Sequence, residues 1–157
     1  LFATDPNGSA RPLLWVENIQ PMEFPHNENV LIDPYALGLL LGDGSLNMKA
    51  TRQIPVVLTA HKDDWAIYEE EIPYALGKVY TDRRNTNVQC RTVIGLSQYI
   101  SAQGVSTHGN EKKIPEDYLF GSVTQRLALL QGLMDTDGSC AEDGKSSFSS
   151  NNEISIE

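Results

Sequence analysis

Residues 36–44 read ALGLLLGDG, and residues 130–138 read LQGLMDTDG. Both stretches have glycine in third place, a small residue four positions later, and Asp-Gly at the end. Glycine in a helix interior costs about 1 kcal/mol relative to alanine, so the pattern indicates helices that pack closely. The repetition predicts a two-fold arrangement in which Asp43 and Asp137 emerge at the same end. Two carboxylates that close can hold a divalent metal against a phosphate group.

The helical period assigns the face on which these two helices meet. Gly38 and Gly42 lie four residues apart on one face, and Gly132 and Thr136 offer the matching face. These four residues are the predicted helix-packing contacts. One terminal Asp-Gly alone is ordinary turn chemistry, and an unrelated α+β protein with two fortuitous Asp-Gly helices stays open as an alternative.

The composition is that of a globular domain. The chain has 157 residues, of which 40% are hydrophobic and 21% charged, so it can bury a core. Cys90 and Cys140 make neither a disulfide framework nor a zinc spacing. No apolar stretch approaches the ~20 residues of a membrane span, and residues 1–20 hold no secretory signal. We therefore expect a cytoplasmic protein with no membrane partner.

The net charge of −9, taken alone, argues against a nucleic-acid partner, because phosphate contacts come from Lys and Arg. The charges are unevenly distributed. Residues 63–71 are acidic, whereas residues 78–91 are basic, with Lys78, Arg83, Arg84 and Arg91 against Asp82. A basic strand pair beside an acidic helix would present one positive face, although scattered surface charge explains the composition more simply.

Local patterns predict the elements of a first unit. Asp33-Pro34 is a strong helix start for residues 34–42, and Gly44 ends this helix. Residues 1–30 read as an extended lead-in with one strand at 13–18. The remaining expected elements are strands at 45–48 and 53–60, a helix at 62–72, a hairpin of strands at 78–84 and 88–94, and a helix at 97–103.

A second unit begins in the same way. After a short helical turn that ends at Phe120, Ser122 and Gln125 predict a capping box at the start of the second long helix. Residues 139–157 read as two strands joined by an Asp-Gly turn. The second helix is expected to bury one apolar face, made of Leu127, Leu130, Leu133 and Met134.

The two repeated stretches resemble the paired signature of the LAGLIDADG, or dodecapeptide, homing endonucleases in their intein-embedded form. The match at 130–138 is close, whereas 36–44 has Leu41 and Gly42 where the signature has an acid and alanine. Residues 33–38 look like the opening of the intein-borne version. Residues 111–115, EKKIP, look like the Lys-x-Ile-Pro block between the two helices. The resemblance covers roughly residues 20–157.

The resemblance implies an α+β fold, in which an αββαββα unit is repeated about a pseudo-dyad and lays antiparallel strands in the DNA major groove. It implies a lead-in or linker at 1–30, with an intein splicing domain as one source, followed by an endonuclease domain at 31–157. The expected divisions of that domain are a first repeat at 33–108, a connecting block at 109–121 and the start of a second repeat at 122–157, with its remainder missing.

The resemblance also implies a bacterial, archaeal or phage-infected cell. The implied activity is Mg²⁺-dependent cleavage of both strands of double-stranded DNA at one long target site, with Mn²⁺ as a substitute metal. Asp43 and Asp137 match the metal-binding acids, and the backbones of Gly42 and Thr136 are further candidate ligands. The expected DNA contacts are Lys49, Arg52, Lys78, Arg83, Arg84 and Arg91.

Lys112 matches the lysine of the connecting block, which would polarise a water or steady the phosphate charge; Lys113 is the alternative. The chain departs from an intein at both ends, since Leu1 is not a nucleophilic Cys or Ser and Asn151-Asn152 has no His before it. We therefore expect this piece neither to splice nor to cut efficiently without a C-terminal half-domain, supplied in cis or in trans. The rival hypothesis is a degenerate or maturase-like domain that binds nucleic acid, or supports splicing, without cleaving.

Overall fold

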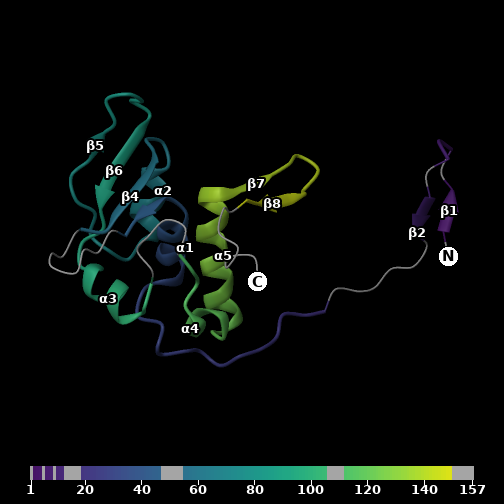
Figure 1. The fold of residues 1–157 in the computed structure, drawn as a ribbon, viewed down its shortest axis with the longest axis horizontal. Coiled ribbons are helices and arrows are strands. Elements are labelled where there is room, and N and C mark those ends of the chain that lie inside the picture. Colours follow the sequence, from purple (N-terminus) through teal and green to yellow (C-terminus); the bar gives the residue numbers. More distant parts are fainter. Residues whose placement is uncertain are drawn as a thin grey trace.

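The chain forms a mixed α+β structure around two long helices that lie side by side (Figure 1). This computed structural model describes residues 2–4, 6–8, 10–12, 19–46, 55–105 and 112–149. A four-stranded antiparallel sheet packs against the first long helix, and a two-stranded hairpin leaves the end of the second (Figure 1). None of the described helices is long and apolar enough to cross a membrane.

The first long helix, α1 (Pro34–Asp43), begins as the sequence predicts. Asp33 caps it by accepting a hydrogen bond from the backbone N–H of Ala36 at 2.9 Å, and proline occupies its first turn. The helix ends at Gly44, which has an extended backbone with φ of −81° and is therefore not a left-handed stop. Glycine is needed there for space, because a Cβ atom would lie 2.6 Å from Leu40 Cα.

The first unit then follows the expected order of strand, strand, helix, hairpin and helix. Its elements are β3 (Gly44–Ser45), β4 (Val57–His61), α2 (Trp65–Glu71), β5 (Tyr80–Thr81), β6 (Val88–Thr92) and α3 (Ser97–Ala102). The antiparallel strands are ordered β3-β4-β6-β5. The β5–β6 loop, 82–87, is longer than predicted, because Asp82 folds it back by accepting backbone hydrogen bonds from Arg84 and Asn85.

The second unit starts with α4 (Glu116–Leu119), α5 (Val123–Asp137), β7 (Gly138–Cys140) and β8 (Ser146–Phe148). The predicted capping box of Ser122 and Gln125 is present. The predicted hairpin turn is present too, with Gly144 at φ of +83°, where glycine is favoured. In both units the glycine that follows the aspartate begins an antiparallel strand pair, Gly44 with Leu58 and Gly138 with Phe148, although the connections between the paired strands differ in length.

The predicted apolar face of α5 is confirmed at Leu133 and wrong at Leu127 and Leu130, while Met134 is half-buried. Leu127 and Leu130 are 58% and 51% exposed, whereas Leu129 and Leu133 are buried. The reason is that Gly132, rather than the leucine spacing, selects the face that approaches α1. The core is centred on α1 and the covered face of the sheet, with Leu37, Leu39, Leu58, Leu96 and Ile100 fully buried.

The lead-in differs from its prediction at both ends. β1 (Phe2–Thr4) pairs with β2 (Ala10–Pro12) in a hairpin that stands apart from the other elements (Figure 1). The strand predicted at 13–18 lies outside the described residues. Closer to the body, Asn27 exchanges hydrogen bonds with the buried Gln125 side chain, at 3.0 Å in both directions. The lead-in is thereby fastened to the start of α5.

Candidate metal and nucleic-acid site

The two long helices touch through their glycines. A Cβ atom on Gly38 would lie 2.8 Å from the backbone nitrogen of Leu133, and one on Gly132 would lie 2.9 Å from that of Leu39. One helical turn later, a Cβ atom on Gly42 would lie 2.6 Å from the Cβ of Thr136. The structure thus brings together the four predicted helix-packing residues.

Asp43 and Asp137 are the last residues of α1 and α5, and their charges interact. Partial burial raises the pKa of Asp43, the charge of Asp137 raises it further, and the nearby Lys112 ammonium lowers it. Both carboxylates lie at helix C-termini, where the backbone dipoles add negative potential. The shared negative potential at this end of the helix pair favours a cation.

The donor set at the helix ends fits magnesium. Mg²⁺ is usually held by one or two carboxylates, together with waters and substrate phosphate, rather than by a full protein cage. The described residues contain no cluster of three or more acidic, histidine or cysteine side chains placed to hold a metal. Asp43 and Asp137 are the residues that would hold the ion.

Lys112 lies against the end of α1. Its Nζ donates to the carbonyl oxygens of Leu40, Leu41 and Gly42, each at 3.1 Å, and to that of Gly44 at 2.6 Å. Burial lowers the pKa of Lys112, and the charges of Asp43 and Asp137 act in the opposite direction. The lysine and the two acids that the sequence singled out therefore share one site.

A further acidic group near these helix ends was missed from the sequence. The Tyr35 hydroxyl donates to Asp135 Oδ2 at 2.8 Å, which links the first turn of α1 to the last turn of α5. Asp135, together with Asp64, Ile67 and Tyr68, lines a small cavity of about 170 Å³. Burial raises the pKa of Tyr68 to about 12, and the charges of Asp64, Asp135 and Asp43 also raise it. Asp135 stands two places before Asp137, but no spacing rule links it to Tyr35.

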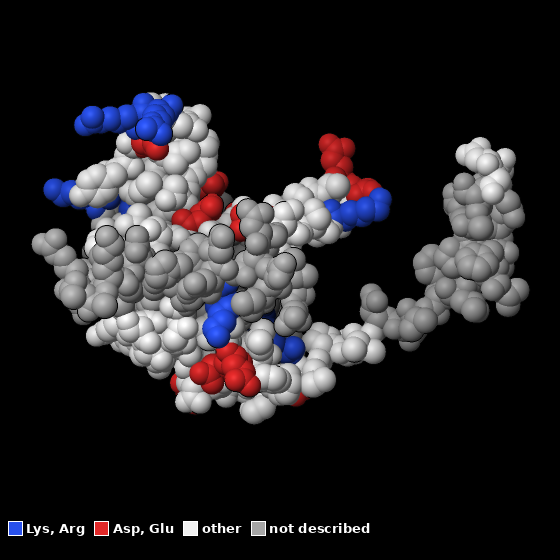
Figure 2. Space-filling view, in the orientation of Figure 1, with Lys and Arg blue, Asp and Glu red and all other residues white. Residues whose placement is uncertain are grey.

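The basic residues proposed for DNA contact divide into two groups. Arg83 and Arg84 are exposed within the 82–87 loop, and Lys78 is exposed just before β5; basic side chains gather at the loop end of the β5–β6 hairpin (Figure 2). Arg91, by contrast, pairs with Leu58 and so faces the helix-covered side of the sheet. Lys49 and Arg52 lie outside the described residues.

Arg91 has structural partners on that covered side. Its guanidinium stacks 5.3 Å from the centre of the Trp65 ring, forms an ion pair with Glu69, and donates to the carbonyl of Gly77 at 2.9 Å. Its side chain is only 13% exposed. The expectation that Arg91 contacts DNA is therefore corrected, because this arginine fastens α2 to the sheet.

The opposite, open face of the sheet is mostly uncharged. At the paired positions of β4, β5 and β6, cross-strand neighbours on this face are small, hydroxyl-bearing or aromatic side chains. They are Val57, Thr59, His61, Tyr80, Val88, Cys90 and Thr92. Such side chains can contact base edges, but they cannot neutralise phosphates.

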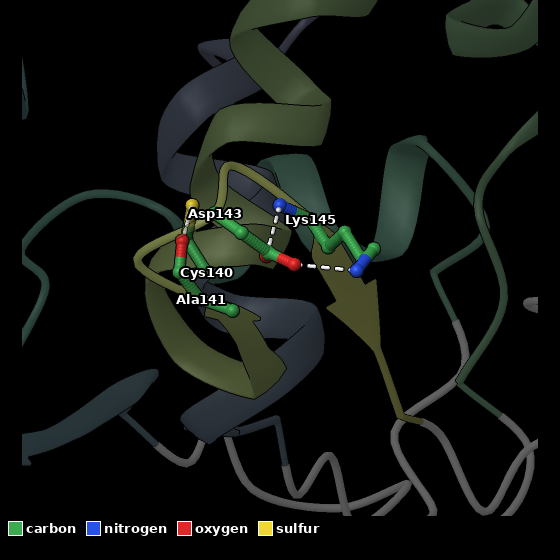
Figure 3. Close-up of polar contacts among 4 residues, drawn as sticks. All are labelled: Cys140, Ala141, Asp143 and Lys145. Carbon is green, nitrogen blue, oxygen red and sulfur yellow. Dashed lines mark hydrogen bonds and ion pairs between the residues drawn. The ribbon is translucent and has the colours of Figure 1, made fainter. Parts of the chain in front are cut away.

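The β7–β8 tip contains Gly144-Lys145-Ser146, a sequence reminiscent of the end of an ATP-binding P-loop. It lacks the required geometry, because Ser139 stands where that motif needs its first glycine and the segment is a hairpin rather than a strand-to-helix loop. Lys145 pairs with Asp143, and the Cys140 thiol faces the Ala141 carbonyl at 3.6 Å (Figure 3). Nothing at this tip indicates nucleotide binding.

Comparison with known proteins adds one relative. No protein-family model matches the chain. The chain is similar to the replicative DNA helicase DnaB of Mycobacterium intracellulare, with 32% identity over 139 residues, which is 88% of this chain and 19% of that protein. The chain therefore spans about a fifth of the length of this curated relative.

Proposed function

We propose that this chain is a site-specific, Mg²⁺-dependent DNA endonuclease domain of the LAGLIDADG type, carried by an intein or another mobile element. The observation that carries the proposal is the convergence of Asp43 and Asp137 at the ends of two glycine-packed helices. The antiparallel strand pair that begins at the glycine after each aspartate supports a repeated unit about a pseudo-dyad. The second unit would be completed by a C-terminal half-domain, in cis or in trans.

In this function, the two carboxylates bind and orient a metal beside the scissile phosphate. If Mg²⁺ were bound there, it would supply Lewis-acid chemistry for phosphodiester hydrolysis. The glycine contacts hold the two helix ends together, so that both acids face one phosphodiester region. The Asp43–Asp137 repulsion, which raises the pKa of Asp43, is relieved when a cation lies between them.

The sheet supplies the proposed DNA surface. Arg83 and Arg84 are exposed at the hairpin end, Lys78 is exposed just before β5, and all three suit phosphate contacts, which set the position of the duplex. The hydroxyls of Thr59, Thr92 and other open-face residues suit base edges in the major groove. Positioning and sequence reading are thus divided between the hairpin end and the open face.

The similarity to a DNA helicase is best explained by an insertion. An ATP-driven helicase motor needs a phosphate-binding loop of the form GxxxxGK[ST], and the chain contains no such sequence. The match also spans only 19% of the relative. We therefore propose that the chain is an element carried within a replicative helicase, rather than part of its motor.

A non-cleaving domain that binds nucleic acid, or supports splicing, is the second candidate. It is favoured by the net charge of −9 and by the open sheet face, which has no Lys or Arg at its described paired positions. Weak DNA affinity would follow, because non-specific binding comes largely from phosphate neutralisation.

Cleavage of DNA that carries the uninterrupted helicase gene separates the two candidates. In the intact protein that contains this chain, we expect Mg²⁺-dependent double-strand cleavage that is abolished in Asp137→Asn and unchanged in the matched hairpin-tip variant Asp143→Asn. Binding without cleavage by the unaltered protein would establish the second candidate instead. Equal cleavage by Asp137→Asn and the unaltered protein would refute the site.

A further inference from the structure

The ammonium of Lys112 lies among carbonyl oxygens at the end of α1. A lysine has three N–H donors, and four carbonyl oxygens, those of Leu40, Leu41, Gly42 and Gly44, lie within 3.1 Å of Nζ. Three of these carbonyls belong to the last turn of the helix, and the fourth belongs to the first strand residue. The ammonium thus holds the chain at the point where α1 turns into β3, on either side of Asp43.

The end of α5 shares one backbone cap with α1 and differs in its second support. The N–H of Gly138 donates to the Met134 carbonyl, as that of Gly44 does to the Leu40 carbonyl, and the N–H of Ser149 donates to the Asp137 carbonyl at 3.3 Å. The hairpin that follows α5 therefore holds Asp137, whereas a side chain from the connecting block holds Asp43. The two acids of the repeat have unequal supports.

We propose that Lys112 is a positioning residue, which directs the Asp43 carboxylate towards the metal by closing the end of α1, and that the Gly42 carbonyl is bound by Lys112 rather than by the metal. This inference rests on the proposed function. It replaces the expected role of Lys112 at a water or phosphate, because the donors of the ammonium point at the backbone. It also replaces the expected metal-ligand role of the Gly42 backbone.

The sign of one measurement distinguishes this role from a simple charge effect. By charge alone, removal of a cation beside the acids should tighten the binding of a divalent metal. A positioning role predicts the opposite, since the Asp43 carboxylate loses its direction. With Mn²⁺ as the probe and the full 157-residue chain, we expect Lys112→Ala to weaken binding at least tenfold, as measured by electron paramagnetic resonance.

Chemical rescue tests the same point in the same variant. Propylammonium replaces the atoms that Lys112→Ala removes, so adding it should restore Mn²⁺ affinity and also raise the urea midpoint of unfolding. The control Lys62→Ala removes an exposed lysine outside the site and should change neither quantity. If Lys112→Ala is too unstable to bind metal, propylammonium must recover both folding and affinity.

Each outcome bears on one proposal. Unchanged or tighter Mn²⁺ binding in Lys112→Ala overturns the positioning role, as does a loss that propylammonium does not reverse. Asp137→Asn tests the nuclease site separately. If that variant binds Mn²⁺ as well as the unaltered chain, the proposed metal site fails; if it loses Mn²⁺ while Lys112→Ala does not, only the inference about Lys112 fails.

Discussion

The contact between α1 and α5 makes a quantitative prediction for Gly38→Ala. The added Cβ would lie 2.8 Å from the backbone nitrogen of Leu133 and 2.9 Å from the carbonyl carbon of Gly132. Ordinary contacts to a Cβ begin at 3.4 Å. The Leu129 carbonyl oxygen lies closer still, so the helices must separate by more than about 0.6 Å, because all three obstacles are backbone atoms that no side-chain rotation can move.

The expected net loss of stability is about 2 kcal/mol. Forced overpacking of a close contact costs about 1–3 kcal/mol, and a radial gap near 0.5–1 Å forfeits a quarter to a half of each dispersion contact along the interface. The better helix propensity of alanine returns about 1 kcal/mol. Urea unfolding of Gly38→Ala should therefore show a lower midpoint with little change in slope, and Mn²⁺ affinity should fall because the acids move apart.

A matched pair of variants isolates the steric cause. A Cβ on Gly42 would meet the side chain of Thr136, with their Cβ atoms 2.6 Å apart. Gly42→Ala should therefore be rescued, in part, by Thr136→Gly, which moves the glycine to the other helix. The same second change should not rescue Gly38→Ala. A Gly38→Ala protein as stable as the unaltered chain, or rescued equally by Thr136→Gly, would refute the close-packing argument.

Three further predictions concern single side chains. Because the pKa of Asp43 is raised, the charged carboxylate destabilises the folded state at pH values above that pKa, and this cost vanishes once the acid is protonated in both the folded and the unfolded state. Asp43→Asn should therefore raise the urea midpoint of unfolding at pH 7 but not at pH 3. Equal effects at the two pH values would contradict this prediction. Arg91→Met should lower the free energy of unfolding by about 1–2 kcal/mol, because the stacking on Trp65 and the ion pair with Glu69 are lost. The salt dependence of DNA binding should stay unchanged. A weaker salt dependence in this variant would mean that Arg91 contacts DNA phosphates. Gln125→Ala removes a buried amide that caps α5 and pairs with Asn27, so thermal unfolding should show a loss of about 2 kcal/mol, whereas a change within ±0.5 kcal/mol would mean that the lead-in is not fastened there.

The repeated stretch was informative because a glycine inside a helix indicates where the backbone of another helix approaches closely. Gly38 and Gly132 predicted which helix faces meet, and the structure places them in contact. The cap at Asp33 and the capping box at Ser122 were predictable because each involves neighbouring residues in the chain. The apolar face of α5 was not, since the leucines fit two faces and only the approach of α1 chooses between them.

The side of the sheet on which Arg91 lies could not be predicted from the alternation of residues along its strand. A period of two divides strand residues into two faces, but it does not identify which face a helix covers. The register of β4 with β6 decides this, and it depends on contacts more than 25 residues apart in the chain, such as Leu58 with Arg91. Likewise, the contact of Lys112 with the end of α1 joins residues about 70 positions apart, which no local pattern specifies.

The electrostatics at the helix ends show that stability alone does not explain this site. A helix C-terminus carries partial negative charge and is stabilised by basic residues, yet neither α1 nor α5 has a basic residue in its last turn. Both end instead in an aspartate, and the close glycine contacts bring the two unfavourable ends together. The Lys112 ammonium, from a distant part of the chain, offsets this potential without cancelling it, since Asp43 keeps a raised pKa. An aspartate at a helix C-terminus is locally unfavourable, and the fold brings two of them together. This arrangement is the one expected of a cation-binding site.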